Sequence, residues 1–114
     1  MIQIDPQNQI HMIQGDTAIF AFRLDNYTLQ SGDCVFFTLK KNLSDPSPVI
    51  QKSITAFEDG SCRISLTAAD TDLPCGDYVY DVQCNLADGR VDTVIGPCYF
   101  HIIGGVTNDS GSSE

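Results

Sequence analysis

Three side chains in this sequence, His11, Cys75 and His101, are of types that act as general bases or nucleophiles in enzymes. Each histidine lies between apolar residues of an alternating segment, which is typical of an ordinary strand position. A reactive thiol needs a cationic neighbour or a helix N-terminus, whereas Asp72 and Asp77 place negative charge on both sides of Cys75. The sequence therefore predicts a protein that is not an enzyme.

Four carboxylates gather between residues 70 and 81, where they could supply the oxygen ligands that calcium prefers. They are Asp70, Asp72, Asp77 and Asp81. Their spacing does not match an EF-hand loop, and aspartate is also the residue of turns and helix caps. The five cysteines, at positions 34, 62, 75, 84 and 98, include no Cys-x-x-Cys pair. We therefore expect no metal, no cofactor and reduced cysteines.

Composition narrows the classes of partner. A chain of 114 residues with 42% hydrophobic residues has room for one domain and one core. Its net charge of −9 would repel phosphate backbones, so we expect no nucleic-acid binding. No apolar run is long enough to cross a membrane, and the first residues lack the basic and apolar segments of a signal peptide. We expect a protein made in the cytoplasm, without membrane association.

Alternation of apolar and polar residues recurs along the whole chain, which predicts strands rather than helices. Residues 1–105 are predicted to form an all-β sandwich of seven or eight antiparallel strands, and the small polar residues 106–114 a flexible tail. Segments 49–56 and 62–66 are expected to pair as a hairpin around the Asp59-Gly60 turn. Thr67 is expected to cap one short helical turn.

A sequence typical of a sandwich corner follows that helical turn. Tyr78 opens an alternating strand directly after a turn that contains Asp72 and Gly76. In immunoglobulin-like sandwiches, a tyrosine at this place hydrogen-bonds back to the backbone a few residues upstream. We therefore predict an immunoglobulin-like fold in which Asp72, Gly76 and Tyr78 form the structural corner, with the Asp72 carboxylate accepting bonds from the turn amides.

The register of the last hairpin decides which residues face outward. A three-residue loop at 87–89 would pair Val82 with Val94 and Tyr78 with Cys98, without a bulge. A two-residue turn would instead require a bulge at Gly96 and Pro97. We favour the first register. It leaves an apolar outer face, which we predict to be an interface and a possible site of self-association, formed by Val79, Val91, Ile95 and Tyr99.

Six segments carry a resemblance to a known group of proteins: residues 15–20, 33–39, 59–61, 66–71, 73–83 and 89–96. Together they resemble the small immunoglobulin-like proteins of tailed phages and prophages of Gram-positive bacteria, including the N-terminal domains of baseplate upper proteins. The resemblance implies a non-catalytic structural or adaptor module that binds other virion or tail proteins. It also implies a location in the bacterial cytoplasm during assembly and in the virion afterwards.

A second interpretation is a carbohydrate-binding or adhesin module. Such a module requires aromatic side chains clustered on an exposed face or loop. Most of the six phenylalanines and four tyrosines fall on faces that we predict to point inward. The sequence therefore favours the adaptor.

Overall fold

The computed structural model describes residues 2–4, 6–24 and 27–105, and the predicted tail at 106–114 lies outside the described residues. The elements are β1 (Ile2–Ile4), β2 (Ile10–Ile13), β3 (Ala18–Phe22), β4 (Cys34–Lys40), β5 (Ile50–Ile54), β6 (Cys62–Leu66), α1 (Ala68–Thr71), β7 (Gly76–Asn85) and β8 (Val91–Ile103). The all-β prediction is confirmed. Among these elements, no helix is long and apolar enough to span a membrane.

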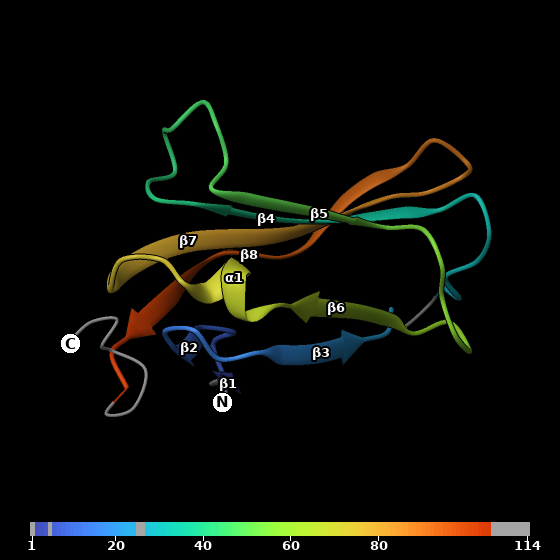
Figure 1. Cartoon of the computed structure of the whole chain (residues 1–114). Helices are drawn as coiled ribbons and strands as arrows, with labels where there is room; N and C mark the ends of the chain where they lie inside the picture. Colours follow the sequence, from blue (N-terminus) through green and yellow to red (C-terminus); the bar gives the residue numbers. More distant parts are fainter. Residues whose placement is uncertain (1, 5, 25–26, 106–114) are drawn as a thin grey trace.

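The strands form two sheets that face each other (Figure 1). The larger sheet has the order β1-β2-β8-β7-β4-β5, and the smaller sheet pairs β3 with β6. The expectation of purely antiparallel pairing is wrong at one place, because β2 runs parallel to β8. The larger sheet is therefore mixed. Parallel pairing is possible here because β2 and β8 lie far apart in sequence, and parallel strands need a long connection.

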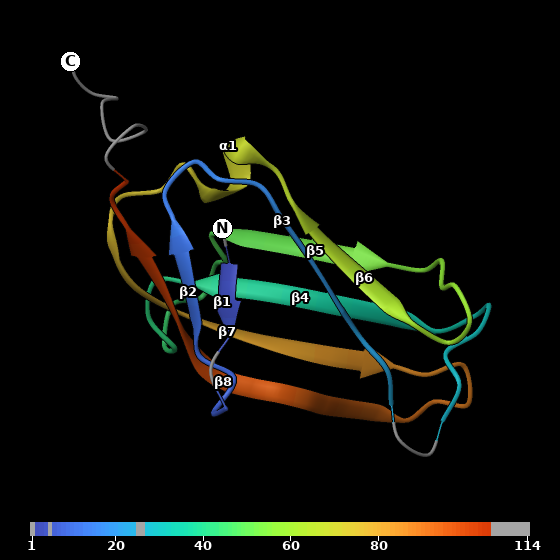
Figure 2. The same ribbon diagram turned by 90° about the horizontal axis from the view of Figure 1, so that it is seen from below.

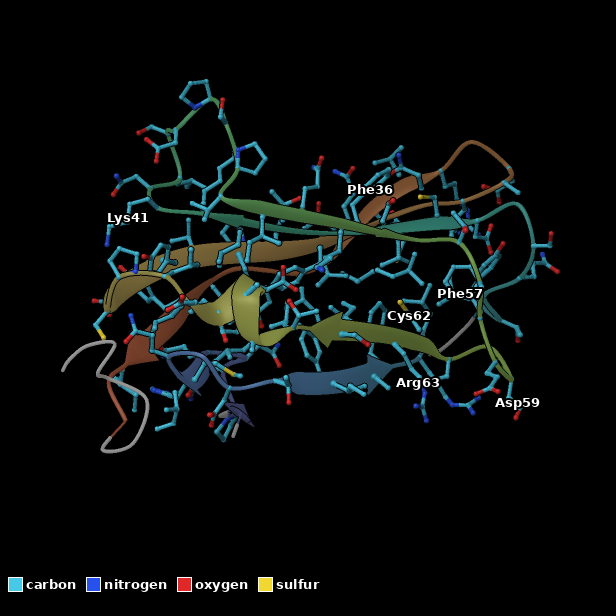
Figure 3. The ribbon with its side chains drawn as sticks, viewed as in Figure 1. Phe36, Lys41, Phe57, Asp59, Cys62 and Arg63 are labelled. Carbon is cyan, nitrogen blue, oxygen red and sulfur yellow. The ribbon has the colours of Figure 1, made fainter. Side chains whose placement is uncertain are left out.

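The core lies between the two sheets and follows the alternation of the sequence. On β4, Val35, Phe37 and Leu39 are fully buried, while the residues between them are partly exposed. Figure 3 shows Cys62 of β6 between the sheets and Phe36 of β4 on the outer side of the larger sheet. The side of the larger sheet that faces β6 is its inner face, and the side that carries Phe36 is its outer face.

The predicted hairpin of residues 49–56 and 62–66 does not form. The turn itself is present, since Asp59 and Gly60 both have positive φ angles. However, β5 pairs with β4 and β6 pairs with β3, so the chain crosses from one sheet to the other at this point (Figure 2). A turn signal is local, and it does not decide whether the flanking strands pair with each other.

The short helix α1 begins as expected. The Thr67 hydroxyl accepts a hydrogen bond from the Asp70 amide at 3.1 Å, and the Asp70 carboxylate accepts one from the Thr67 amide at 2.8 Å. Asp70 also forms an ion pair of 2.7 Å with Lys52 of β5. Burial alone would raise the pKa of Asp70, but Lys52 and the Thr67 cap outweigh it and lower this pKa. The helix is thus fixed to the edge of the larger sheet.

The register of the last hairpin differs from our expectation. The predicted three-residue loop is present, since the Leu86 amide donates to the Arg90 carbonyl at 2.8 Å. Further along, Val82 pairs with Ile95 rather than Val94 because β8 bulges, and Tyr78 pairs with Phe100 rather than Cys98. Ile95 therefore shares the inward face of Val82 and packs against the core. Its predicted place on the outer face is wrong.

Candidate binding surface

Tyr78, Gly76 and Asp72 occupy the end of the sandwich where α1 leads into β7. The Tyr78 hydroxyl donates a 2.7 Å hydrogen bond to the Pro74 carbonyl. Gly76 has a φ of 149°, and an added Cβ would stand 3.1 Å from the Lys41 ammonium. The expected hydrogen bonds to Asp72 are not found: within the described residues, its carboxylate accepts none, and only its backbone amide contacts Ala69. Tyr78 and Gly76 therefore shape this corner.

A hollow of about 460 Å³ lies on the outer face of the larger sheet, beside this corner. The loop between β4 and β5 rises from that side of the sheet (Figure 1). Lys41, at the start of this loop, donates to the Asp77 carbonyl at 3.2 Å and lies 4.6 Å from the centre of the Tyr78 ring. The hollow is lined by Lys41, Asn42, Leu43, Asp77, Val79, Pro97, Cys98 and Tyr99.

The lining includes exposed apolar side chains. Leu43 is 65% exposed and Tyr99 54% exposed, and Val79 pairs with Tyr99 across β7 and β8. Two predicted interface residues, Val79 and Tyr99, thus lie side by side in the hollow. Val91 is also exposed but does not line it. Leu43 escaped sequence analysis because it follows the alternating segment that ends at Lys40.

A row of stacked rings extends this surface across β8 to β2. The Tyr99 and His101 ring centres are 5.6 Å apart, and those of His101 and His11 are 4.8 Å apart. Beside the row lies a second, wider hollow of about 620 Å³, to which Cys75 and both histidines contribute. Asp77 lines both hollows, so they adjoin each other. The structure therefore gathers the three residues with possible chemistry on one face.

His101, which lines the second hollow, contacts two oxygen atoms of this chain. Its Nδ1 lies 2.6 Å from the Asp77 carboxylate, and its Nε2 lies 3.1 Å from the Gln9 side-chain oxygen. Each ring nitrogen thus has an oxygen atom of this chain within hydrogen-bonding distance. Within the described residues, no group of three or more histidine, cysteine or acidic side chains is placed to hold a metal ion.

The cysteines are all free thiols. Cys62 and Cys84 are fully buried on facing sides of the core, whereas Cys75 is exposed. Burial, together with the nearby Cys84, raises the pKa of Cys62 to about 11. Cys62 and Cys84 therefore act as small apolar core residues.

Sequence analysis missed one buried carboxylate, Asp33. It accepts hydrogen bonds from the Tyr27 hydroxyl at 2.9 Å, the Gln30 amide at 3.0 Å and the Ala87 amide at 2.8 Å. Burial would raise the pKa of Asp33, but these donors outweigh it and lower this pKa. An aspartate in a turn is ordinary, and nothing local indicates that it reaches residue 87. Its contacts assign it a structural role at the opposite end of the sandwich from Tyr78.

No protein-family model matches this sequence, and no curated protein sequence is similar to it. Among solved structures, a similar one is described as a "putative glycoside hydrolase" from Bacteroides vulgatus ATCC 8482. It is 14% identical with a TM-score of 0.45, over 87% of this chain and 17% of that protein. This chain thus spans about a sixth of that protein's length. The likeness is too weak to support a functional argument.

Proposed function

We propose that this protein is a non-catalytic adaptor module with an immunoglobulin-like fold, which binds another protein through the hollow beside Tyr99. Its proposed setting is a phage or prophage tail or baseplate, the class of assembly that the sequence resemblance implies. The observation that carries the proposal is the exposed apolar pair formed by Leu43 and Tyr99 at one hollow. Exposed apolar residues gathered at a concave site are typical of a surface that a partner covers.

The surroundings of this pair suit a protein interface. Lys41 and Asp77 add charged groups to a lining that also holds apolar side chains, and protein-protein contacts commonly combine both kinds of group. Lys41 is already positioned by the Asp77 carbonyl and the Tyr78 ring, so little side-chain freedom remains to be lost when a partner binds. The proposed partner inserts an apolar side chain between Leu43 and Tyr99.

The immunoglobulin-like part of the proposal is supported by topology. β3 and β6 face β4, β7 and β8, and the antiparallel order β8-β7-β4 agrees with the second sheet of such domains. Tyr78, with its hydrogen bond to Pro74, stands where the corner tyrosine of that fold stands. The non-catalytic part is supported by His101, because each of its ring nitrogens lies within hydrogen-bonding distance of an oxygen of this chain, on Asp77 or Gln9.

The test is a binding assay against the proteins encoded by neighbouring genes, in which tail and baseplate components are expected. Leu43→Asp should abolish the interaction, since it places a charge at the apolar centre of the contact. Thr93→Asp is the matched control: it adds the same charge at an exposed position of β8 that does not line the hollow. Equal loss of binding in both variants, or in neither, would refute the assignment of this surface.

Carbohydrate binding is the second candidate, and Tyr99 is the observation that favours it. An exposed ring beside a carboxylate, here that of Asp77, could stack on a sugar and accept bonds from its hydroxyls. However, all ten phenylalanines and tyrosines lie in the described residues, and Tyr99 alone is largely exposed. The cluster of exposed aromatics that a sugar site needs is therefore not present there. Binding to a glycan array that Tyr99→Ala abolishes would reverse this preference.

A further inference from the structure

The hollow beside Tyr99 continues along the outer face of the larger sheet. It shares Leu43 and Val79 with a smaller hollow of about 50 Å³. That smaller hollow shares Lys40 and Asp81 with a third hollow of about 380 Å³. Because each hollow adjoins the next, the three form one trough over β7 and β4. Beyond Leu43 and Val79, the trough is lined by Phe36, Thr38, Lys40, Gln51, Asp81 and Gln83.

Two opposite charges lie in the middle of this trough. Lys40 of β4 lies opposite Val79 of β7. Asp81, which follows Val79 on the same face of β7, therefore lies diagonally from Lys40, with the two Cα atoms about 7–8 Å apart. Both residues are half-buried, yet within the described residues neither side chain forms an ion pair or a hydrogen bond. Since a partly buried charge is costly to leave unpaired, each is open to an opposite charge from outside.

The far end of the trough presents amide groups. The Gln51 side-chain nitrogen donates to the Thr38 hydroxyl at 3.1 Å, which leaves the Gln51 side-chain oxygen as an acceptor. Gln83 is half-buried, and its side-chain amide has no hydrogen-bond partner within the part of the chain that the structure describes. Such amides match the N–H and C=O groups of a polypeptide backbone. This end of the trough is therefore suited to a main chain, and its middle to charged side chains.

On the basis of the function proposed above, we propose that the partner protein lays an extended segment along this trough. An acidic side chain of the segment pairs with Lys40, and a basic one pairs with Asp81. An extended chain advances about 3.3 Å per residue, so side chains about two positions apart span the diagonal between the two charges. An apolar residue of the same segment fills the hollow beside Tyr99.

Charge complementarity favours a segment of a different protein over other occupants. A neutral glycan would cover Lys40 and Asp81 without pairing either charge, whereas acidic and basic side chains pair both. A second copy of this chain carries the same net charge of −9, which opposes its approach. Because the contact depends on opposite charges, its binding should weaken as the NaCl concentration rises.

Overlapping peptides that tile the proteins encoded by neighbouring genes test this contact with the full chain. Peptides that bind should carry an acidic and a basic residue close together. Lys40→Glu should raise their dissociation constants at least about tenfold, and so should Asp81→Lys. Arg63→Glu is the matched control for Lys40→Glu, because it changes the net charge equally at an exposed residue of the smaller sheet (Figure 3). It should bind the peptides like the wild type.

Charge exchange between the peptide and this protein tests the pairing directly. Replacing the acidic residue of a bound peptide by lysine should weaken its binding to the wild type. The same peptide should bind Lys40→Glu to within about threefold of the original pair. Circular dichroism spectra of the variants should match that of the wild type. Failure of the exchange to restore binding would overturn the pairing, and so would equal weakening by Lys40→Glu and Arg63→Glu.

Leu43→Asp separates the charged contact from the proposed function. If Leu43→Asp abolishes binding while Lys40→Glu and Asp81→Lys bind like the wild type, the proposed function stands and the charged contact is refuted. Whole proteins that bind when none of their peptides does would refute the extended segment. If neither the peptides nor the whole proteins bind, the segment and the proposed function both fail.

Discussion

The carboxylate of Asp33 accepts a 2.8 Å hydrogen bond from the backbone amide of Ala87, a residue 54 positions further along the chain. The same carboxylate accepts hydrogen bonds from the Tyr27 hydroxyl and the Gln30 amide. One buried side chain thus joins the segment before β4 to the loop between β7 and β8. Because a buried acceptor with several donors is costly to remove, this end of the sandwich depends on one residue.

We expect Asp33→Asn to lower the thermal unfolding midpoint by several degrees at pH 7. The folded-state pKa of Asp33 is lowered, so its contribution is fully present above the unfolded-state value of about 3.9 and is lost as the pH falls through the folded-state value. The difference between wild type and variant should therefore shrink below about pH 4. Asp92→Asn, at an exposed position, is the control. A difference that does not change with pH would contradict this account.

Tyr78→Phe should lower the free energy of unfolding by about 1 kcal/mol, because the ring still packs while the hydrogen bond to Pro74 is lost. Urea denaturation measures this change. Tyr99→Phe removes the same hydroxyl from an exposed ring and should leave the midpoint unchanged. Equal midpoints for wild type and Tyr78→Phe would show that the corner hydrogen bond does not stabilise the fold.

Gly96→Ala should destabilise the protein by about 2 kcal/mol or more, since overpacking adds to a strained backbone. The added Cβ would stand 2.6 Å from the Tyr80 carbonyl oxygen, and φ at Gly96 is 90°. Gly89 offers a matched comparison, because its φ is 95° but a Cβ there meets nothing within 4 Å. Gly89→Ala should cost about 1 kcal/mol. If calorimetry finds the two variants equally stable, β8 does not approach β7 this closely.

Alkylation with iodoacetamide should separate the five thiols by rate. Cys75 is exposed and should react first, whereas Cys62 should react only on unfolding, because it is fully buried and its pKa is raised to about 11. Mass spectrometry of the native and the denatured protein gives both rates. If Cys62 and Cys84 stay unalkylated in the denatured protein unless a reductant is added, the two residues form a disulfide. That result would contradict the free thiols described above.

The strands could be predicted from sequence where burial alternates regularly. The alternating segment 34–40 coincides with β4, and the apolar residues that share one face of it, Val35, Phe37 and Leu39, are the buried ones. Which strands pair with each other was harder to predict from the sequence. The Asp59-Gly60 turn suggested a hairpin, yet β5 and β6 belong to different sheets. The parallel contact of β2 with β8 joins residues about ninety positions apart, and no local pattern encodes it.

The candidate surface was predictable only in part. Val79 and Tyr99 stood out because apolar residues fell on an outward face, and both line the hollow. Ile95 was misplaced because the bulge in β8 turns it inward. Leu43 could not be found, because a loop residue carries no periodicity that indicates which face it approaches.

Photo-crosslinking in the organism that makes this protein tests the central claim most directly. A benzophenone amino acid in place of Tyr99 stands at the edge of the hollow, and the same group in place of Thr93 lies on β8 outside it. Our account predicts a crosslink from position 99 to a tail or baseplate protein, lost in Leu43→Asp, and none from position 93. Crosslinks from both positions alike, or none from position 99 in assembled particles, would contradict it.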